Sequence, residues 1–214
     1  MASWWTVVGW ALVGGVAGAL LSTVTRTFLT TSHNPSRLAS RSTSAAVTAL
    51  LFAALAWRIG GLVDLVAYSY LAAVGVPLAV IDTIEQRLPS KLLWPSYGVL
   101  AALFGLAAVA QANGSGALRA LVGMACLAAF YLVLAVVSRG GLGAGDVKLG
   151  GVLGLAMGWQ SWSTILIGTI LGWSLATLVR LALRLSGRWG RDSAMPLGPF
   201  LLAGAFAAVL ASLG

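Results

Sequence analysis

The chain is a near-continuous series of long apolar runs, separated by short polar or glycine-rich loops. Hydrophobic residues make up 59% of its 214 residues and charged residues only 8%, a composition that excludes an ordinary soluble domain. A chain that crosses a bilayer must satisfy its backbone polar groups internally, as helices or as a closed barrel. These runs do not alternate between apolar and polar residues, which favours helices. We therefore expect an all-α, polytopic integral membrane protein.

The runs predict about eight transmembrane helices in a single membrane-embedded domain covering residues 1–214. Their expected ranges are 4–24, 45–57, 62–81, 92–110, 117–137, 147–158, 162–183 and 196–213. The sixth is short, because a helix over 147–158 reaches about 18 Å, against a hydrocarbon core of ~30 Å. Gly150, Gly154 and Gly158 recur every four residues along it. We therefore expect this helix to be pressed against a partner helix.

The basic residues predict how the chain is oriented in the membrane. With eight crossings, 11 of the 13 Lys and Arg residues fall on one side, and only Arg58 and Arg119 fall on the other. Cytoplasmic loops carry an excess of Lys and Arg, so the loops at Ser36, Ser90, Gly140 and Gly187 should be cytoplasmic and both termini external. The net charge of +8 is thus explained by membrane orientation, and we expect no nucleic-acid partner.

Two of the five acidic residues stand where an apolar segment meets a polar loop: Asp82 and Asp146. A carboxylate in or beside a membrane segment is costly to keep, so each one needs a reason. The predicted topology brings both to the same, cytoplasmic end. Two close carboxylates can share one proton, so that the ionised one takes a proton from water and the protonated one polarises a carbonyl. An intramembrane aspartyl protease requires such a pair.

Other polar residues offer no competing chemistry. The sole histidine, His33, lies in a polar loop without an evident carboxylate partner, and the chain supplies too few ligands at plausible spacing for a metal site. The single cysteine, Cys126, permits no disulfide and is expected to be a small helix-packing residue. Glu85 and Arg87 are expected to form a solvated loop pair. We expect no cofactor and no metal.

A third acid, Asp64, is expected to neutralise Arg58 near the outer face. Loop tryptophans such as Trp159 are expected to anchor the chain at the membrane interface.

Three segments occur in an order that resembles one family. Residues 81–89 read Ile-Asp-Thr-Ile-Glu-Gln-Arg-Leu-Pro, residues 143–149 read Gly-Ala-Gly-Asp-Val-Lys-Leu, and residues 195–200 read Met-Pro-Leu-Gly-Pro-Phe. With these motifs, the chain from Ala45 onward resembles the prepilin peptidases. These are GxGD-type membrane aspartyl proteases that cleave leaders from type IV pilin-like precursors. A GxGD alone is a weak signal, but three ordered motifs in a multispanning chain are specific.

The resemblance implies an activity, a location and a set of site residues. It implies an endopeptidase of the bacterial cytoplasmic membrane, open to the cytoplasm, that acts on precursors with a basic leader and a hydrophobic helix. Asp82 and Asp146 would be the catalytic pair. The supporting motif residues would be Pro89, Gly143, Gly145, Lys148, Pro196, Gly198 and Pro199.

The chain departs from the bifunctional members of that family in one stretch. Those members carry a cytoplasmic domain after the first helix, usually with paired cysteines, that accompanies N-methylation of the product. Here residues 25–44 form a short loop without cysteine. The resemblance therefore supports cleavage and not methyl transfer.

A proton-coupled transporter with the two aspartates as ion ligands is the alternative from another class. Transporters often show repeated halves and charges at the membrane midplane. No internal repeat is evident in this chain, and its two acids lie at helix ends.

Overall fold

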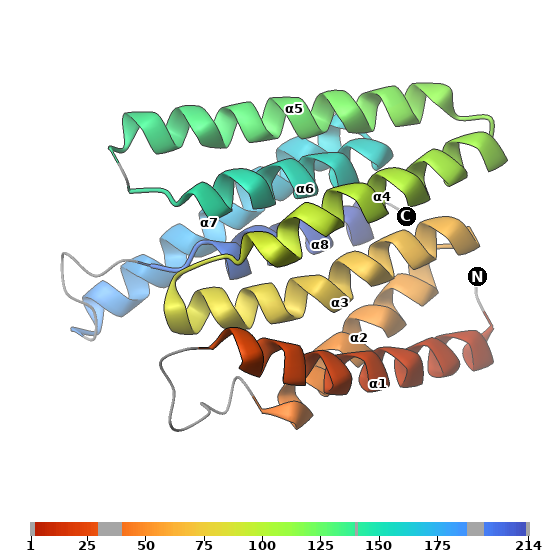
Figure 1. The fold of residues 1–214 in the computed structure, drawn as a ribbon, viewed down its shortest axis with the longest axis horizontal. Coiled ribbons are helices and arrows are strands. Elements are labelled where there is room, and N and C mark those ends of the chain that lie inside the picture. Colours follow the sequence, from red (N-terminus) through yellow and green to blue (C-terminus); the bar gives the residue numbers. More distant parts are fainter. Residues whose placement is uncertain (1–2, 30–39, 140, 188–194, 213–214) are drawn as a thin grey trace.

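The computed structural model describes residues 3–29, 40–139, 141–187 and 195–212, and this part of the chain is all-helical. Its eight helices follow one another in alternating directions (Figure 1): α1 (Trp4–Phe28), α2 (Arg41–Arg58), α3 (Leu62–Glu85), α4 (Ser90–Ala110), α5 (Gly114–Val137), α6 (Ala144–Gln160), α7 (Trp162–Leu185) and α8 (Gly198–Ser212). Five of them, α1, α3, α4, α5 and α7, are long and apolar enough to cross a membrane. The predicted fold class, a multi-pass α-helical membrane protein, is confirmed.

The helix ends differ from the sequence prediction by a few residues, and two of the differences matter for function. Helix α3 continues past residue 81 to Glu85, so Asp82 lies within its last turn and not beyond it. Helix α6 begins at Ala144 and not at Val147, so Asp146 lies inside its first turn. With 17 residues α6 spans about 25 Å, longer than expected but still shorter than the hydrocarbon core.

Because the helices alternate in direction, alternate loops gather at the same end of the bundle. We use the name aspartate end for the end at which α1, α3, α5 and α7 finish and α2, α4, α6 and α8 begin (Figure 1). Asp82 and Asp146 both lie there. The basic residues Arg26, Arg41, Arg87, Lys91, Arg139, Lys148, Arg180 and Arg184 lie on described segments at this end, and Arg58 and Arg119 lie at the opposite end. Ser36 and Gly140 fall outside the described residues.

Small residues bring α6 against α5, as the glycine spacing predicts. A Cβ atom at Gly158 would lie 2.9 Å from the Arg119 carbonyl oxygen, and one at Gly154 would overlap the carbonyl of Gly123. At Gly150 the ring of Tyr131 occupies the space. Backbones can approach this closely only where side chains are absent. Every residue of α6 from Leu149 to Trp159 is buried, so α6 is a core helix.

Replacing Gly154 with valine should therefore destabilise the bundle. The added side chain has no room against α5, and overpacking of this kind costs about 1–3 kcal/mol. Resistance to unfolding by SDS in mild detergent measures the effect. Gly105→Val is the matched control, because a Cβ at Gly105 meets nothing within 4 Å. Equal resistance of the two variants would contradict the packing described for α6.

At the opposite end, polar contacts tie α3 to α6, and here two sequence predictions were wrong. Asp64 accepts hydrogen bonds from the indole of Trp159 (3.0 Å) and the amide of Gln111 (2.9 Å), not a salt bridge from Arg58. Trp159 is only 4% exposed, so it is no interface anchor. A buried indole N–H needs an acceptor, and an apolar interior leaves the Asp64 carboxylate as its partner.

Two further contacts fix the same end of α6. The Tyr68 hydroxyl of α3 donates to the Ala156 carbonyl at 2.8 Å. The Arg119 guanidinium donates to three carbonyls that end α6, those of Gly158, Trp159 and Gln160, at 2.7–2.9 Å. A cation at a helix C-terminus satisfies its unpaired carbonyls and its dipole. The two helices that carry Asp82 and Asp146 are thus held together far from both residues.

Cys126 also differs from expectation. It is exposed on the outer face of α5 and does not pack between helices.

Candidate active site

Asp82 is a buried carboxylate in the last turn of α3. It is 5% exposed, and its Oδ2 accepts a hydrogen bond from the backbone N–H of Gly198 at 2.8 Å. Gly198 is the first residue of α8, so the start of that helix faces the carboxylate. A Cβ atom at Gly198 would lie 2.8 Å from the same Oδ2. The glycine is therefore needed for the close approach of backbone to carboxylate.

Asp146 is half-buried in the first turn of α6 and caps that helix. Its Oδ2 accepts a hydrogen bond from the Gly143 N–H at 3.2 Å. The N-terminus of a helix favours a negative charge, so this position suits an ionised carboxylate. The second oxygen, Oδ1, is buried and has no hydrogen-bond partner among the described residues. A buried carboxylate oxygen without a partner is costly, and it leaves an acceptor available to a water molecule or a substrate.

The fold brings the two aspartates, 64 positions apart in the sequence, to the same end of the bundle. Both lie at the aspartate end, in the last turn of α3 and the first turn of α6. The start of α6 packs on the loop that follows α3, where a Cβ at Gly145 would lie 2.7 Å from the Cβ of Leu88. Gly145 is thus the small residue that lets the Asp146 turn approach the Asp82 helix.

Lys148, one turn into α6, holds that helix against the first two turns of α4. Its ammonium group donates to the Ser90 hydroxyl at 2.7 Å and lies 5.7 Å from the centre of the Trp94 ring. The Tyr97 hydroxyl donates to the Lys148 carbonyl at 2.7 Å. These contacts give Lys148, one of the supporting motif residues named above, a role in positioning the start of α6 against α4.

The motif prolines lie at helix starts. Pro89 precedes α4 and its carbonyl accepts from the N–H groups of Leu92 and Leu93. Pro199 is the second residue of α8, where a missing N–H costs nothing, and Pro196 lies in the segment just before that helix. These residues fix where α4 and α8 begin and do not reach the carboxylates through a described hydrogen bond.

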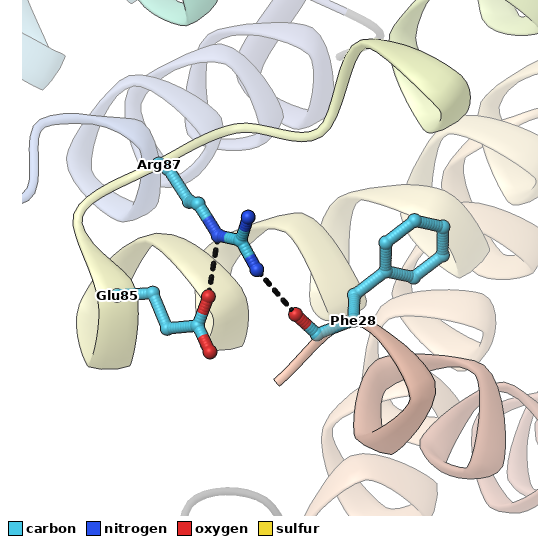
Figure 2. A network of polar contacts seen from close by, with 3 residues as sticks. All are labelled: Phe28, Glu85 and Arg87. Atoms are coloured by element: carbon cyan, nitrogen blue, oxygen red, sulfur yellow. Dashed lines mark hydrogen bonds and ion pairs between the residues drawn. The ribbon is translucent and has the colours of Figure 1, made fainter. Parts of the chain in front are cut away.

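The Glu85–Arg87 pair forms, but it is not the solvated loop pair that the sequence suggested. The Glu85 side chain is only 4% exposed, whereas that of Arg87 is 52% exposed. Figure 2 shows the Arg87 guanidinium between the Glu85 carboxylate and the carbonyl oxygen of Phe28, which it reaches at 2.7 Å. Arg87 thereby ties the end of α1 to the loop that follows the Asp82 helix. Because Phe28 and Arg87 are 59 positions apart, no local sequence pattern indicates that they are in contact.

Taken together, the geometry offers two carboxylates, one buried and one at a helix start, and one of them has a buried oxygen without a hydrogen-bond partner among the described residues. Among the described residues, no group of three His, Cys, Asp or Glu side chains is placed to hold a metal ion. His33 lies outside the described residues. Proton transfer to and from a water molecule or a carbonyl is the chemistry that such a pair can perform.

Comparison with known proteins points to one family. The sequence model of the type IV leader peptidase family matches residues 65–182. A relative from Pseudomonas putida named "Prepilin leader peptidase/N-methyltransferase" is 32% identical over 166 residues, which cover 76% of this chain and 55% of the relative. A relative of the same name from Bacillus subtilis is 30% identical over 168 residues, covering 77% of this chain and 63% of the relative. The chain thus spans between half and two thirds of these relatives' length. No solved structure matches the chain.

Proposed function

Since this chain belongs to the type IV leader peptidase family, we propose that it is a membrane-embedded aspartic endopeptidase. Its substrates are prepilin-like precursors, from which it removes a short basic leader next to a hydrophobic helix. Asp82 and Asp146 are the catalytic pair in this proposal. The observation that carries it is the position of both carboxylates at one end of the bundle, with an oxygen of Asp146 that has no hydrogen-bond partner among the described residues.

The two carboxylates divide the acid and base roles. Asp146, through its Oδ1, takes a proton from water, and the resulting hydroxide attacks the carbonyl carbon of the scissile peptide bond. Asp82 gives its proton to the carbonyl oxygen, which prevents a build-up of negative charge there. As the tetrahedral intermediate collapses, the C–N bond breaks, Asp146 gives its proton to the leaving nitrogen, and Asp82 takes a proton back from the hydroxyl group that re-forms the carbonyl. The products are a leader with a new carboxylate and a mature chain with a new amino terminus.

The proposal places the protein in the bacterial cytoplasmic membrane with the aspartate end in the cytoplasm. Eight of the ten basic residues on described segments lie at that end, and two, Arg58 and Arg119, lie at the other. Loops rich in Lys and Arg stay on the cytoplasmic side. A precursor would then enter as a hydrophobic helix with its basic leader at the cytoplasmic face.

Cysteine labelling from either side of the membrane tests this orientation. In a Cys126→Ala background, Ser42→Cys and Ser186→Cys should react only with cytoplasmic reagent, because both lie exposed at the aspartate end. Ser115→Cys, exposed at the opposite end, is the matched control and should react only from outside. External labelling of Ser186→Cys would contradict the orientation, since a site on that side could not meet a cytoplasmic leader.

We further propose that the chain acts as a single peptidase domain that cleaves without methylating. Its relatives are named for both activities, but residues 25–44 of this chain contain no cysteine and no separate methyltransferase-type domain is expected there. Mass spectrometry of the processed product would decide, because a methylated amino terminus is about 14 Da heavier than a free one. A methylated product made by this chain alone would refute this part of the proposal.

Co-expression with a precursor that has a basic leader and a hydrophobic helix tests the peptidase activity itself. We expect a shortened product whose new amino terminus begins beside the hydrophobic helix. An intact precursor in the presence of folded protein would contradict the proposal, and proton-driven uptake by vesicles that contain the protein would then favour the transporter.

A further inference from the structure

At the end of the bundle opposite the aspartates, α1 begins, α2 ends and α3 begins close together (Figure 1). A hollow of about 440 Å³ lies between these three helix ends. Ser3, Thr6 and Arg58 supply the hydroxyl and guanidinium groups of its lining, and the other lining residues are apolar or glycine. We call it the Arg58 hollow.

Arg58 is a cation without a protein partner. It forms no hydrogen bond and no ion pair with any residue that the structure describes. Arg119, the other basic residue on the described segments of this end, is fully engaged with the carbonyls that end α6. A charged side chain beside a membrane segment needs a reason, and a guanidinium group with unused N–H donors suits an anionic acceptor.

We infer that the Arg58 hollow binds the phosphate group of a phospholipid and that this lipid bridges the ends of α1, α2 and α3. The phosphate accepts hydrogen bonds from the Arg58 guanidinium, and the glycerol and acyl chains cover the apolar part of the lining. The inference concerns a site at the far end from Asp82 and Asp146 and does not depend on the proposed peptidase activity.

Exposed tryptophans place the hollow at the level of the lipid headgroups. Trp57 precedes Arg58 in the last turn of α2 and is 55% exposed. Its ring packs edge-to-face against that of Trp4, which is 72% exposed, with 5.8 Å between the ring centres. Indole rings gather where the hydrocarbon meets the headgroups. The guanidinium group therefore lies at the depth at which the membrane offers phosphate groups.

Two helix starts add positive potential to the hollow. Ser3 precedes the first residue of α1, Leu62 is the first residue of α3, and both line it. First-turn N–H groups have no acceptor within their own helix and favour an anion. The end of α2 has the opposite polarity, which Arg58 offsets. Asp64 also lies in the first turn of α3, but its carboxylate is bound by Trp159 and Gln111 and does not line the hollow.

The deep part of the hollow suits hydrocarbon better than a second polar group. Its most buried lining residues are Ala56 and Ile59, at 2% and 5% exposed. The indole N–H of Trp10 is used by the Ser69 hydroxyl at 2.8 Å, and the Thr6 hydroxyl donates to the Ser3 carbonyl, so neither donor faces a ligand. A ligand with one phosphate and an apolar body matches this lining, whereas a small inorganic anion matches only its rim.

Native mass spectrometry of the delipidated protein in detergent tests the inference. Titration with phosphatidylglycerol should show one molecule bound to the wild type. Arg58→Gln should weaken this binding by at least about tenfold, because it removes a charge-assisted hydrogen bond. Arg41→Gln is the matched control, since Arg41 is exposed at the other end of the same helix, and it should bind as the wild type does. Equal affinity of Arg58→Gln and wild type would overturn the inference.

Two further ligands separate the phospholipid from its parts. Diacylglycerol with the same chains has no phosphate and should bind at least about tenfold more weakly. Inorganic phosphate has no chains and should not displace the lipid at millimolar concentration. Equal binding of diacylglycerol would show that the hollow takes chains alone, and displacement by inorganic phosphate would show a simple anion site. Either result would contradict the inference.

Thermal unfolding gives a second readout, because a ligand that binds only the folded state stabilises it. Phosphatidylglycerol should raise the unfolding temperature of the wild type and of Arg58→Lys, which keeps a charge for the phosphate, but not that of Arg58→Gln. Equal shifts in all three proteins would refute a lipid held by Arg58. If Arg58→Gln does not fold, the comparison of phosphatidylglycerol with diacylglycerol on the wild type decides.

Discussion

Replacing Asp82 or Asp146 with asparagine is expected to abolish leader removal while the protein remains folded in the membrane. An amide can neither take a proton from water as a carboxylate does nor give one to a carbonyl. Loss of one general acid or base costs about 10²–10⁴-fold in rate, and neither aspartate can replace the other because each has its own hydrogen-bond partner. Immunoblotting of a co-expressed precursor measures the residual processing.

The matched control is Asp64→Asn, a third acid on the same helix as Asp82 but at its far end. An asparagine there keeps one acceptor oxygen for the indole of Trp159, so processing should stay within a few-fold of wild type. Near-normal cleavage by either Asp82→Asn or Asp146→Asn would remove that residue from the catalytic pair.

The second large effect is expected at Gly198. In Gly198→Ala the new methyl carbon would lie 2.8 Å from Oδ2 of Asp82, closer than such atoms approach, so the carboxylate or the start of α8 must move. A displacement of about 1 Å at a catalytic group can cost ~10²-fold in rate. Processing rates of purified protein in detergent, with a fluorescent precursor peptide, would measure the loss.

Gly98→Ala serves as the control for this substitution. Gly98 lies in α4, and a Cβ there meets nothing within 4 Å, so the change should leave the rate unaltered. The Gly198→Ala variant should also retain wild-type resistance to SDS, because the clash is local to Asp82. Full activity in Gly198→Ala would mean that the Gly198–Asp82 contact has no part in catalysis.

Most of the architecture could be predicted from the sequence because the bilayer restricts the possible folds. Long apolar runs can only be helices there, and their spacing predicted all of the helices that the structure describes to within a few residues at most ends. The spacing of Gly150, Gly154 and Gly158 likewise predicted that another helix packs closely against α6. Side-chain volume along one helix face can be read locally, as at Gly154, without knowing the partner.

The contacts between distant segments could not be predicted in this way. Nothing near Asp82 in the sequence indicates that an N–H from Gly198, 116 positions later, would bind it. Asp64 was matched to Arg58 because they are neighbours in sequence, whereas the fold offers it the buried indole of Trp159, 95 positions away. Local pattern shows that a carboxylate needs a partner, but the packing of helices decides which partner it receives.

If the two aspartates share a proton, as the proposed mechanism requires, their environments predict which one holds it. Asp82 is nearly fully buried and lies at the C-terminal end of a helix, and both features disfavour a negative charge. Asp146 is more exposed and lies at a helix N-terminus, which favours one. Each accepts one backbone N–H, so these two bonds largely offset each other. We therefore expect Asp82 protonated and Asp146 ionised in the resting enzyme.

Infrared difference spectroscopy of the purified protein tests the shared-proton pair most directly. Because the two groups are coupled, rate profiles report only on the pair, whereas a protonated carboxyl group has its own absorption band. We predict one such band at neutral pH in the wild-type protein, lost in Asp82→Asn and retained in Asp146→Asn. A wild-type spectrum without that band would contradict the shared-proton pair, and loss of the band only in Asp146→Asn would reverse the two roles.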